Sequence, residues 1–152
     1  MFQKIKDLLL SQNIEFKILH HEPTLTSEAS AKARGEDLST GGKALVLKID
    51  QSFKVLVISA SKKINSKAIK KYFGAKKLRF ANREELFELT GLEPGSVPPF
   101  GRPIINLDLY VDESITTNEK IAFNAGSLTD SIIMSTKDFL ALAEPVVFSF
   151  SK

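Results

Sequence analysis

Residues 42–60 read GKALVLKIDQSFKVLVISA. Apolar residues dominate both halves of this segment, and the polar triplet Asp50-Gln51-Ser52 separates them. Val, Ile and Leu in short runs favour strands, whereas Asp and Ser are typical turn residues. The segment therefore predicts two strands, Lys43 to Ile49 and Phe53 to Ala60, joined as a hairpin.

Helical patterns flank this hairpin on both sides. Phe2 to Gln12 carries apolar residues at helical spacing. Four later helices are predicted from residues whose side chains cap helix N-termini. Thr26 or Ser27 caps a helix that runs through Ala33, and Asn65 or Ser66 caps one that runs through Phe73. Asn82 caps the helix from Arg83 to Thr90, and Ser135 caps a last helix that runs through Leu142.

Six further segments show strand patterns. They are Ile14 to Ile18, Lys76 to Phe80, Ile104 to Val111, Ile121 to Asn124, Ile132 to Met134 and Pro145 to Phe150. Strands outnumber helices, and neither internal repeats nor βαβ alternation dominate. The sequence therefore predicts an α+β fold: a mixed, mostly antiparallel sheet, curled or forming a partial barrel, with helices packed outside.

Two connections complete this outline. Gly91 to Pro103 holds four of the six prolines and three of the eight glycines, which predicts a loop. Asp112 to Glu119 is predicted as a polar connection.

The composition narrows the possible classes of protein. With 152 residues, 43% apolar and 26% charged, the chain predicts one domain over residues 1–152. The absence of cysteine excludes disulfides, thiolate zinc sites and cysteine nucleophiles. No apolar run approaches the about 20 residues of a membrane-spanning helix. We therefore expect a cytoplasmic protein with no membrane partner.

The net charge of +3 is unevenly distributed. Residues 61–79 hold eight Lys or Arg and no acid, which leaves 13 basic and 18 acidic residues elsewhere, a balance of −5. On the predicted helix and its N-terminal flank, Lys63, Lys67, Lys70 and Lys71 recur at three- and four-residue spacing and share a face opposite Ile69 and Phe73. A solvated helix face and a surface for nucleic-acid phosphates both fit this pattern.

Two features could carry chemistry. Residues 95–101 read GSVPPFG; glycine permits close approach of a ligand, and proline fixes the shape of a loop. Such a loop can direct backbone N–H groups at a carbonyl or phosphate oxygen, or it can be a structural turn. Lys43 opens an apolar strand after two glycines, so it is either a phosphate anchor or a solvated lysine at a strand end.

The two histidines, His20 and His21, are adjacent, so on a strand they point to opposite faces. No second cluster of metal-ligating residues accompanies them, and we expect no metal site. No G-x-S-x-G motif supports a serine nucleophile. Both histidines are compatible with a simple turn.

Taken together, these segments resemble the YbaK family of aminoacyl-tRNA deacylases, which includes the editing domain inserted in bacterial prolyl-tRNA synthetases. His21-Glu22-Pro23 is similar to the opening H-x-P of that family, and Gly42-Lys43-Ala44 to the segment with its characteristic lysine. Residues 91–101 resemble its G-x-x-x-P loop, and residues 124–139 its closing strands and helix. The four segments occur in the same order as in that family, across about 120 residues.

The resemblance implies hydrolysis of the ester that joins a wrong amino acid to the 3′-terminal adenosine of a tRNA, with no cofactor. It assigns the catalytic role to Lys43, Gly95, Ser96 and Pro99. It assigns substrate binding to His21, Thr24, Val97, Pro98, Phe100, Asn124 and Gly126. Asn124 departs from family members that carry a His there, which removes one histidine from the site.

The resemblance also implies partners: an aminoacyl-tRNA, a synthetase acting alongside, and no DNA. Lys43 would hold a phosphate or ribose of the terminal nucleotide, and a water assisted by the ribose hydroxyl would attack the ester. Beside such a site, we expect Lys63, Lys67, Lys70 and Lys71 to dock the tRNA acceptor arm. The alternative is a tRNA- or RNA-binding module of the same fold without catalysis, or a domain that binds a small molecule or protein.

Overall fold

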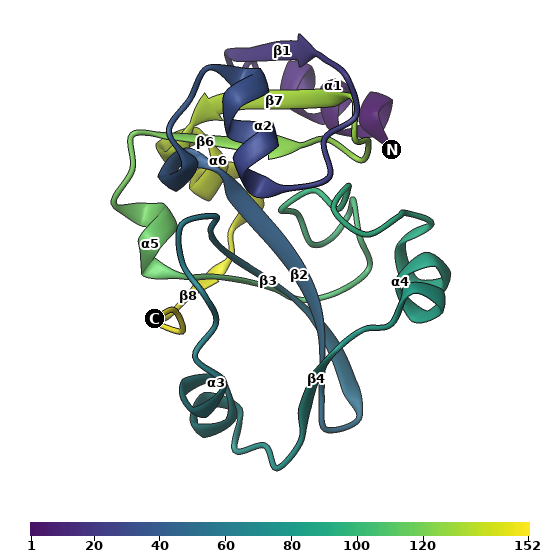
Figure 1. Ribbon diagram of the computed structural model, residues 1–152, viewed down its shortest axis with the longest axis vertical. Helices are drawn as coiled ribbons and strands as arrows, with labels where there is room; N and C mark the ends of the chain where they lie inside the picture. Colours follow the sequence, from purple (N-terminus) through teal and green to yellow (C-terminus); the bar gives the residue numbers. More distant parts are fainter.

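The central element of the fold is a long hairpin. The computed structural model describes residues 1–152. Strands β2 (Gly42–Ile49) and β3 (Ser52–Ser59) pair antiparallel along their whole length, with Gly42 opposite Ser59 (Figure 1). The chain reverses at Asp50, whose φ of 52° is accommodated by Asp more readily than by most residues. The predicted hairpin is confirmed.

The hairpin lies at the centre of a five-stranded sheet in the order β4-β2-β3-β5-β8. Strand β4 (Leu78–Phe80) pairs antiparallel with β2. Strands β5 (Leu109–Val111) and β8 (Val146–Val147) continue the other side in parallel. The last strand therefore lies at the edge of the sheet, where a segment that begins with proline is tolerated.

A second, three-stranded sheet stands beside the first. Its order is β1 (Phe16–His20), β7 (Asp130–Ser135) and β6 (Lys120–Asn124), all antiparallel. A parallel bridge between Gly41 and Ala122 links it to the start of β2. The predicted α+β class with mostly antiparallel pairing is confirmed. The expected single curled sheet is two sheets, and they do not close into a barrel.

Glycine at the junction of the two sheets permits their close approach. A Cβ on Gly42 would lie 2.7 Å from Cδ1 of Ile121 on β6. A Cβ on Gly41 would lie 3.1 Å from that of Ala60. A contact of 2.7 Å is closer than real Cβ atoms come to a neighbour, and one of 3.1 Å is unusually tight. Glycine at position 42 therefore lets β2 lie against the smaller sheet, next to Lys43.

Helices surround both sheets (Figure 1). Their ranges are α1 Phe2–Ser11, α2 Ser27–Arg34, α3 Ser66–Phe73, α4 Arg83–Thr90, α5 Glu113–Thr116 and α6 Thr136–Ala143, with a 3₁₀ turn at Leu38–Thr40. The four predicted caps are confirmed, since Thr26, Asn65, Asn82 and Ser135 each accept a backbone N–H from the first turn of their helix.

Several segments differ from their predictions. The strand predicted from Pro145 to Phe150 is limited to Val146–Val147, and the one predicted from Lys76 begins at Leu78. The strand predicted at Ile14 to Ile18 runs from Phe16 to His20, because its register follows β7. Residues 104–108 form tight turns rather than a strand, with a hydrogen bond from Leu107 N to Ile105 O. The connection predicted from Asp112 to Glu119 contains α5, because the Asp112 carboxylate accepts the Ser114 N–H at 3.0 Å and caps a helical turn.

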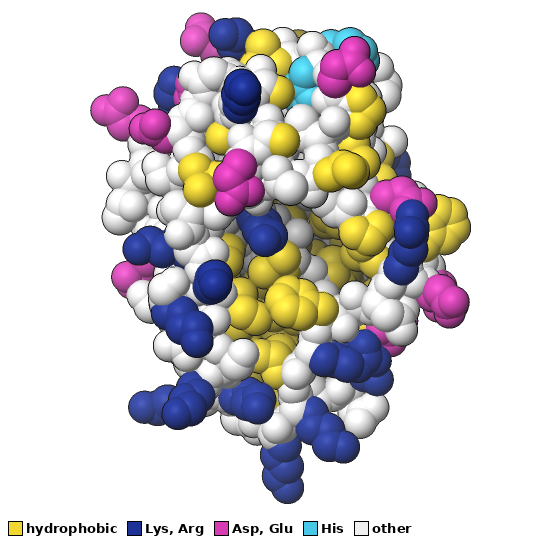
Figure 2. Space-filling view, viewed as in Figure 1, with side chains coloured by type: hydrophobic (Ala, Val, Ile, Leu, Met, Phe, Trp, Pro, Cys, Tyr) yellow, Lys and Arg dark blue, Asp and Glu magenta, His cyan; other side chains and the backbone are white.

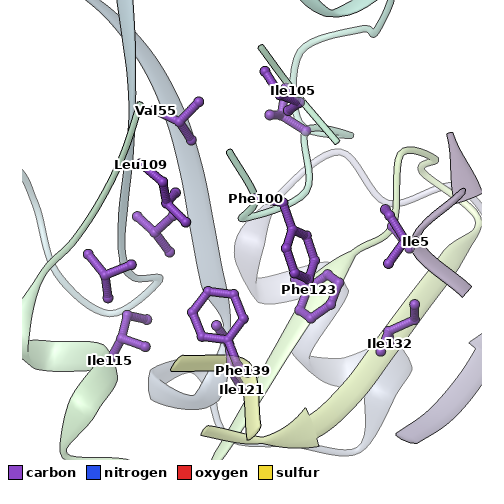
Figure 3. Close-up of a cluster of buried hydrophobic side chains, with 14 of the residues drawn as sticks. Ile5, Val55, Phe100, Ile105, Leu109, Ile115, Ile121, Phe123, Ile132 and Phe139 are labelled. Atoms are coloured by element: carbon purple, nitrogen blue, oxygen red, sulfur yellow. The ribbon is translucent and has the colours of Figure 1, made fainter. Parts of the chain in front are cut away.

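The main hydrophobic core lies between the two sheets. Phe100, from the proline-rich loop, packs against Phe123 and Phe139 with ring centroids 5.6 Å from each (Figure 3). A smaller cluster around Leu56 and Ile69 seats α3 on the other face of the large sheet. No helix is both long and apolar enough to span a membrane. The loop at residues 91–103 is thus anchored in the core at Phe100.

Candidate functional site

A cavity of about 570 Å³ opens where the two sheets meet. Its walls come from the loop before α2, α2 itself, the start of β2, residues 60–63 after β3, the proline-rich loop and the end of β6. The face drawn in Figure 2 has a central hollow where apolar side chains lie between Lys and Arg side chains. The cavity brings together six sequence-predicted residues: Thr24, Lys43, Lys63, Gly95, Val97 and Asn124.

Lys43 presents a cation without a partner at this cavity. It is the second residue of β2, it is exposed, and its ammonium makes no hydrogen bond or ion pair. Lys62 and Lys63 also line the cavity, and both are exposed. An unpaired ammonium at the mouth of a pocket attracts anionic groups such as phosphate.

The proline-rich loop offers two backbone donors. Gly95 has φ of +86°, which favours glycine, and Ser96 turns back so that its N–H and its hydroxyl both donate to Glu93 O, at 3.1 and 2.7 Å. The N–H groups of Gly95 and Val97 have no acceptor within the protein. Both residues line the cavity, so these two donors are free to bind a ligand oxygen.

Asn124 ties this loop to the smaller sheet. Its Nδ2 donates to Gly95 O at 2.7 Å, and its Oδ1 accepts from Arg34 Nη2 at 3.0 Å. Arg34 Nε donates to Ser131 Oγ at 2.9 Å. A network of side chains therefore joins the last residue of α2 to the loop through β6 and β7.

Arg34 has no carboxylate partner in this network. Burial lowers the pKa of its guanidinium to about 10, so it remains protonated at neutral pH. Sequence reasoning missed Arg34. The only local signal is its place at the end of α2, before Gly35, where a basic residue usually serves the helix dipole.

His21 stands behind the network rather than in the cavity. Its Nδ1 lies 2.9 Å from Glu22 O and its Nε2 lies 2.8 Å from Ser131 Oγ. Because a carbonyl oxygen only accepts, the neutral ring carries its proton on Nδ1, and the Ser131 hydroxyl donates to Nε2. His20 points elsewhere and contacts Asp130 at 2.8 Å, a bond that lowers the pKa of that carboxyl.

Hydroxyl groups line the inner wall. Thr24 and Ser30 are almost fully buried, and Ser30 Oγ donates to Thr24 Oγ1 at 2.8 Å. The hydroxyl proton of Thr24 has no acceptor within the protein, so it can donate to a bound molecule. Leu25, in contrast, is 87% exposed and adds an apolar surface at the rim.

The remaining predicted residues do not line the cavity, and their assigned roles stay predictions. Pro98, Pro99 and Phe100 are buried and shape the loop from behind. Gly126, with φ of +78°, lies against Met1 at the turn between β6 and β7. Ser96 is buried, and its hydroxyl is held by Glu93.

The basic stretch divides into two parts. Lys62 and Lys63 belong to the cavity, whereas Lys67, Lys70 and Lys71 lie on α3, whose buried residue is Ile69 as predicted. A second hollow of about 560 Å³ joins that helix to β4; its basic lining residues are Lys48, Lys70, Lys76, Lys77 and Arg79. Basic side chains gather at the lower end of the molecule in Figure 2. The patch therefore extends from the cavity along α3 toward β4.

One acid lies within this second hollow. Backbone N–H groups of Lys77 and Lys76 donate to Asp50 Oδ1 and lower the pKa of its carboxyl. Because these bonds engage Asp50 with the backbone, the lysine side chains stay available. No three His, Asp or Glu side chains of the chain are grouped so that they could hold a metal ion.

Comparison with known proteins identifies the family to which the chain belongs. A family model described as an aminoacyl-tRNA editing domain matches residues 21–142, which include every cavity segment named above. The chain belongs to the aminoacyl-tRNA editing domain family. The resemblance drawn from the motifs is confirmed.

Individual relatives agree with this assignment. The editing domain is 31% identical to the multifunctional Ser/Thr-tRNA deacylase ProXp-y of Escherichia coli K12, over 99% of this chain and 92% of that protein. It is 32% identical to a proline–tRNA ligase of Shouchella clausii over 66% of this chain, which is 17% of the ligase. A crystal structure of a proposed trans-editing enzyme for prolyl-tRNA synthetase shares the fold, with a TM-score of 0.86, 24% identity and coverage of 99% and 96%.

Proposed function

We propose that this editing domain is a deacylase that acts in trans and hydrolyses the ester between a wrongly attached amino acid and the 3′ end of a tRNA. One observation carries the proposal: Lys43, whose ammonium is unpaired, lines the same cavity as Gly95 and Val97, whose N–H groups have no acceptor within the protein. A cation for a phosphate and two donors for a carbonyl oxygen are the groups that an aminoacyl ester on a nucleotide requires.

The reaction needs little from side chains. Lys43 holds the terminal phosphate or ribose, and the two N–H groups bind the ester carbonyl oxygen. Water adds to the carbonyl carbon while the neighbouring ribose hydroxyl assists, and negative charge forms on the oxygen that the N–H groups hold. The bond to the ribose oxygen then breaks, and that oxygen takes up a proton. The products are a free amino acid and an uncharged tRNA.

Positioning and charge stabilisation are sufficient because an aminoacyl ester is already reactive. No carboxylate or imidazole has to act as a general base in this scheme. Glu28 is the only acidic side chain that lines the cavity, and His21 lies behind Ser131.

The inner wall favours amino acids with a hydroxyl group. The buried hydroxyls of Thr24 and Ser30 and the amide of Asn124 offer hydrogen bonds to a small polar side chain. An apolar amino acid would cover the free O–H of Thr24 without offering it an acceptor, and a buried polar group without a partner costs about 1–3 kcal/mol. We therefore propose serine and threonine as the amino acids removed.

A panel of charged tRNAs tests this function. Purified protein is mixed with tRNAs that carry Ala, Cys, Pro, Ser, Thr or Tyr, and release of the amino acid is followed. Ser and Thr should be released fastest. Preference for Ala or Pro would overturn the proposed specificity, and no release from any tRNA would overturn the deacylase function.

A non-catalytic tRNA-binding module is the second candidate, and the basic patch along α3 is the observation that favours it. The same patch serves the deacylase as a docking surface for the acceptor arm. The logarithm of the affinity falls as the logarithm of the salt concentration rises, and each lysine that neutralises a phosphate makes this slope steeper by about 0.7–0.9. Changing Lys67, Lys70 and Lys71 to Gln should therefore flatten that slope by about 2–3.

The salt dependence of a control variant and the amino-acid preference of the neutralised variant separate docking from catalysis. Lys17→Gln, on β1 of the smaller sheet, should leave the slope unchanged. With the α3 lysines neutralised, the preference among amino acids should stay the same while the affinity for every tRNA falls. A changed amino-acid preference would contradict the separation of docking from catalysis.

We also propose that the protein works in the cytoplasm alongside a prolyl-tRNA synthetase. Support comes from proline–tRNA ligases in which a similar segment forms about a fifth of the chain. Adding a synthetase to the deacylation assay should raise the rate at limiting tRNA. An unchanged rate would contradict this partnership.

A further inference from the structure

We propose that Arg34 is a positioning residue that orients the two free N–H groups of the proline-rich loop by fixing the amide of Asn124. The inference rests on the proposed function. It concerns a half-buried cation in the cavity wall that has no ion pair and that the scheme above does not use.

The first step is the orientation of the Asn124 amide. An arginine guanidinium only donates hydrogen bonds, so Nη2 can face only the oxygen of the amide. Rotating the amide by 180° would set its NH₂ group against the guanidinium, donor against donor. Arg34 therefore holds Asn124 with Oδ1 toward α2, where Ser131 Oγ also lies 3.3 Å from that oxygen, and with Nδ2 toward Gly95 O, at 2.7 Å.

The second step is the peptide plane that this amide holds. The oxygen of Gly95 and the nitrogen of Ser96 belong to the same planar peptide unit. Asn124 holds the oxygen end, and Glu93 O holds the N–H end at 3.1 Å. This clamped plane lies between the two peptide units that carry the free N–H groups of Gly95 and Val97. Fixing it restricts the rotation on both sides and so sets the direction of both donors.

The third step is the choice of arginine. Its planar fork reaches Ser131 through Nε and Asn124 through Nη2 at the same time. A lysine ammonium has no such spread and would serve one acceptor or the other. Ser131 is fully buried and also contacts His21, so the fork has a rigid second support.

Kinetics provide the first test. Arg34→Met keeps a side chain of similar length and removes every donor. It should lower kcat for deacylation about 10–100-fold, the cost of misplacing reacting groups, while KM changes less than about threefold because Lys43 is untouched. Lys32→Met, which removes an exposed cation from the same helix, is the control and should change neither. A rise in KM with kcat unchanged would overturn the proposal.

A double-mutant cycle shows whether Arg34 acts through Asn124. Asn124→Ala should lower kcat to a similar extent. In the double variant, kcat should fall by the same factor as in either single variant, and not by the product of the two factors. Multiplied losses would overturn the proposed path. Arg34→Lys should retain part of the activity that Arg34→Met loses.

Hydrogen exchange tests the link without any substrate. In Arg34→Met, the amide of Ser96 should exchange at least about tenfold faster than in the wild type, whereas Ile58 in β3 should keep its rate and report that the fold is intact. If Arg34→Met does not fold, Asn124→Ala tests the same link. Unchanged exchange at Ser96 in both variants overturns the proposal, whether or not the wild type deacylates any tRNA.

Discussion

The buried carboxylate of Asp112 fastens the C-terminal segment, and its removal makes a sharp test of the fold. Its side chain is 1% exposed. Oδ1 accepts the backbone N–H groups of Phe150 and Ser151 at 2.6 and 3.0 Å, and Oδ2 accepts that of Ser114 at the start of α5. The fastened segment pairs in turn with Lys63, a residue of the cavity wall.

The expected cost of Asp112→Ala follows from these bonds. Phe150 is fully buried, so its N–H is left without a partner at a cost of about 1–3 kcal/mol. Loss of the cap on α5 adds about 1 kcal/mol. The half-buried Ser151 N–H can bind water and adds little. The free energy of unfolding should therefore fall by about 2–4 kcal/mol, which lowers Tm by roughly 4–16 °C in a chain of this size.

Denaturation in guanidinium chloride measures this change. Asp37→Ala is the control, because Asp37 is exposed and its side chain caps no backbone group. A loss below about 0.5 kcal/mol for Asp112→Ala, as expected for an ordinary surface change, would show that these hydrogen bonds do not stabilise the fold.

The same carboxylate makes stability depend on pH. Burial raises the pKa of Asp112, but the hydrogen bonds from Ser114, Phe150 and Ser151 together outweigh it and hold the pKa below its usual value. A carboxyl whose pKa is lower in the folded state stabilises the fold above its unfolded pKa, about 3.9, and loses this contribution as the pH falls through the folded pKa. The stability difference between wild type and Asp112→Asn should therefore be largest at neutral pH and should narrow below about pH 4.

Two further changes test the junction of the sheets and a helix cap. Gly42→Ala should lower the free energy of unfolding by about 1–3 kcal/mol, because its Cβ would lie 2.7 Å from Ile121 Cδ1; Ile121→Val, which removes that methyl group, should recover part of the loss. Asn82→Ala should cost about 1 kcal/mol, because Asn82 and Glu85 form a capping box at α4. Both are measured by denaturation, and a neutral Gly42→Ala or a neutral Asn82→Ala would contradict the respective contact.

Local features of the fold could be predicted from the sequence. The hairpin at residues 42–60 has its turn residues between two apolar runs. Thr26, Asn65 and Asn82 cap helices with side chains that reach only three residues along the chain. Such signals depend on neighbours in the sequence, so the chain order alone reveals them.

Features that depend on distant contacts could not be predicted in this way. The separation into two sheets follows from the pairing of β1 with β7, more than 100 residues away. Arg34 contacts Asn124 and Ser131, about 90 and 97 residues along the chain. Nothing next to Arg34 signals either contact. Residue types alone made Lys43 and the proline-rich loop candidates with a structural alternative each, and the resemblance to a known family is what placed them in one predicted site.

The most direct test of the account is the rate at which Lys43→Ala releases serine from mischarged tRNA. The Lys43 side chain is exposed and its ammonium makes no hydrogen bond or ion pair within the protein, so the variant should keep its Tm within about 2 °C. Loss of a charged hydrogen bond worth about 1.5–3 kcal/mol should lower kcat/KM at least tenfold. A folded Lys43→Ala variant that releases serine at the wild-type rate would contradict the central claim that this cavity is the deacylation site.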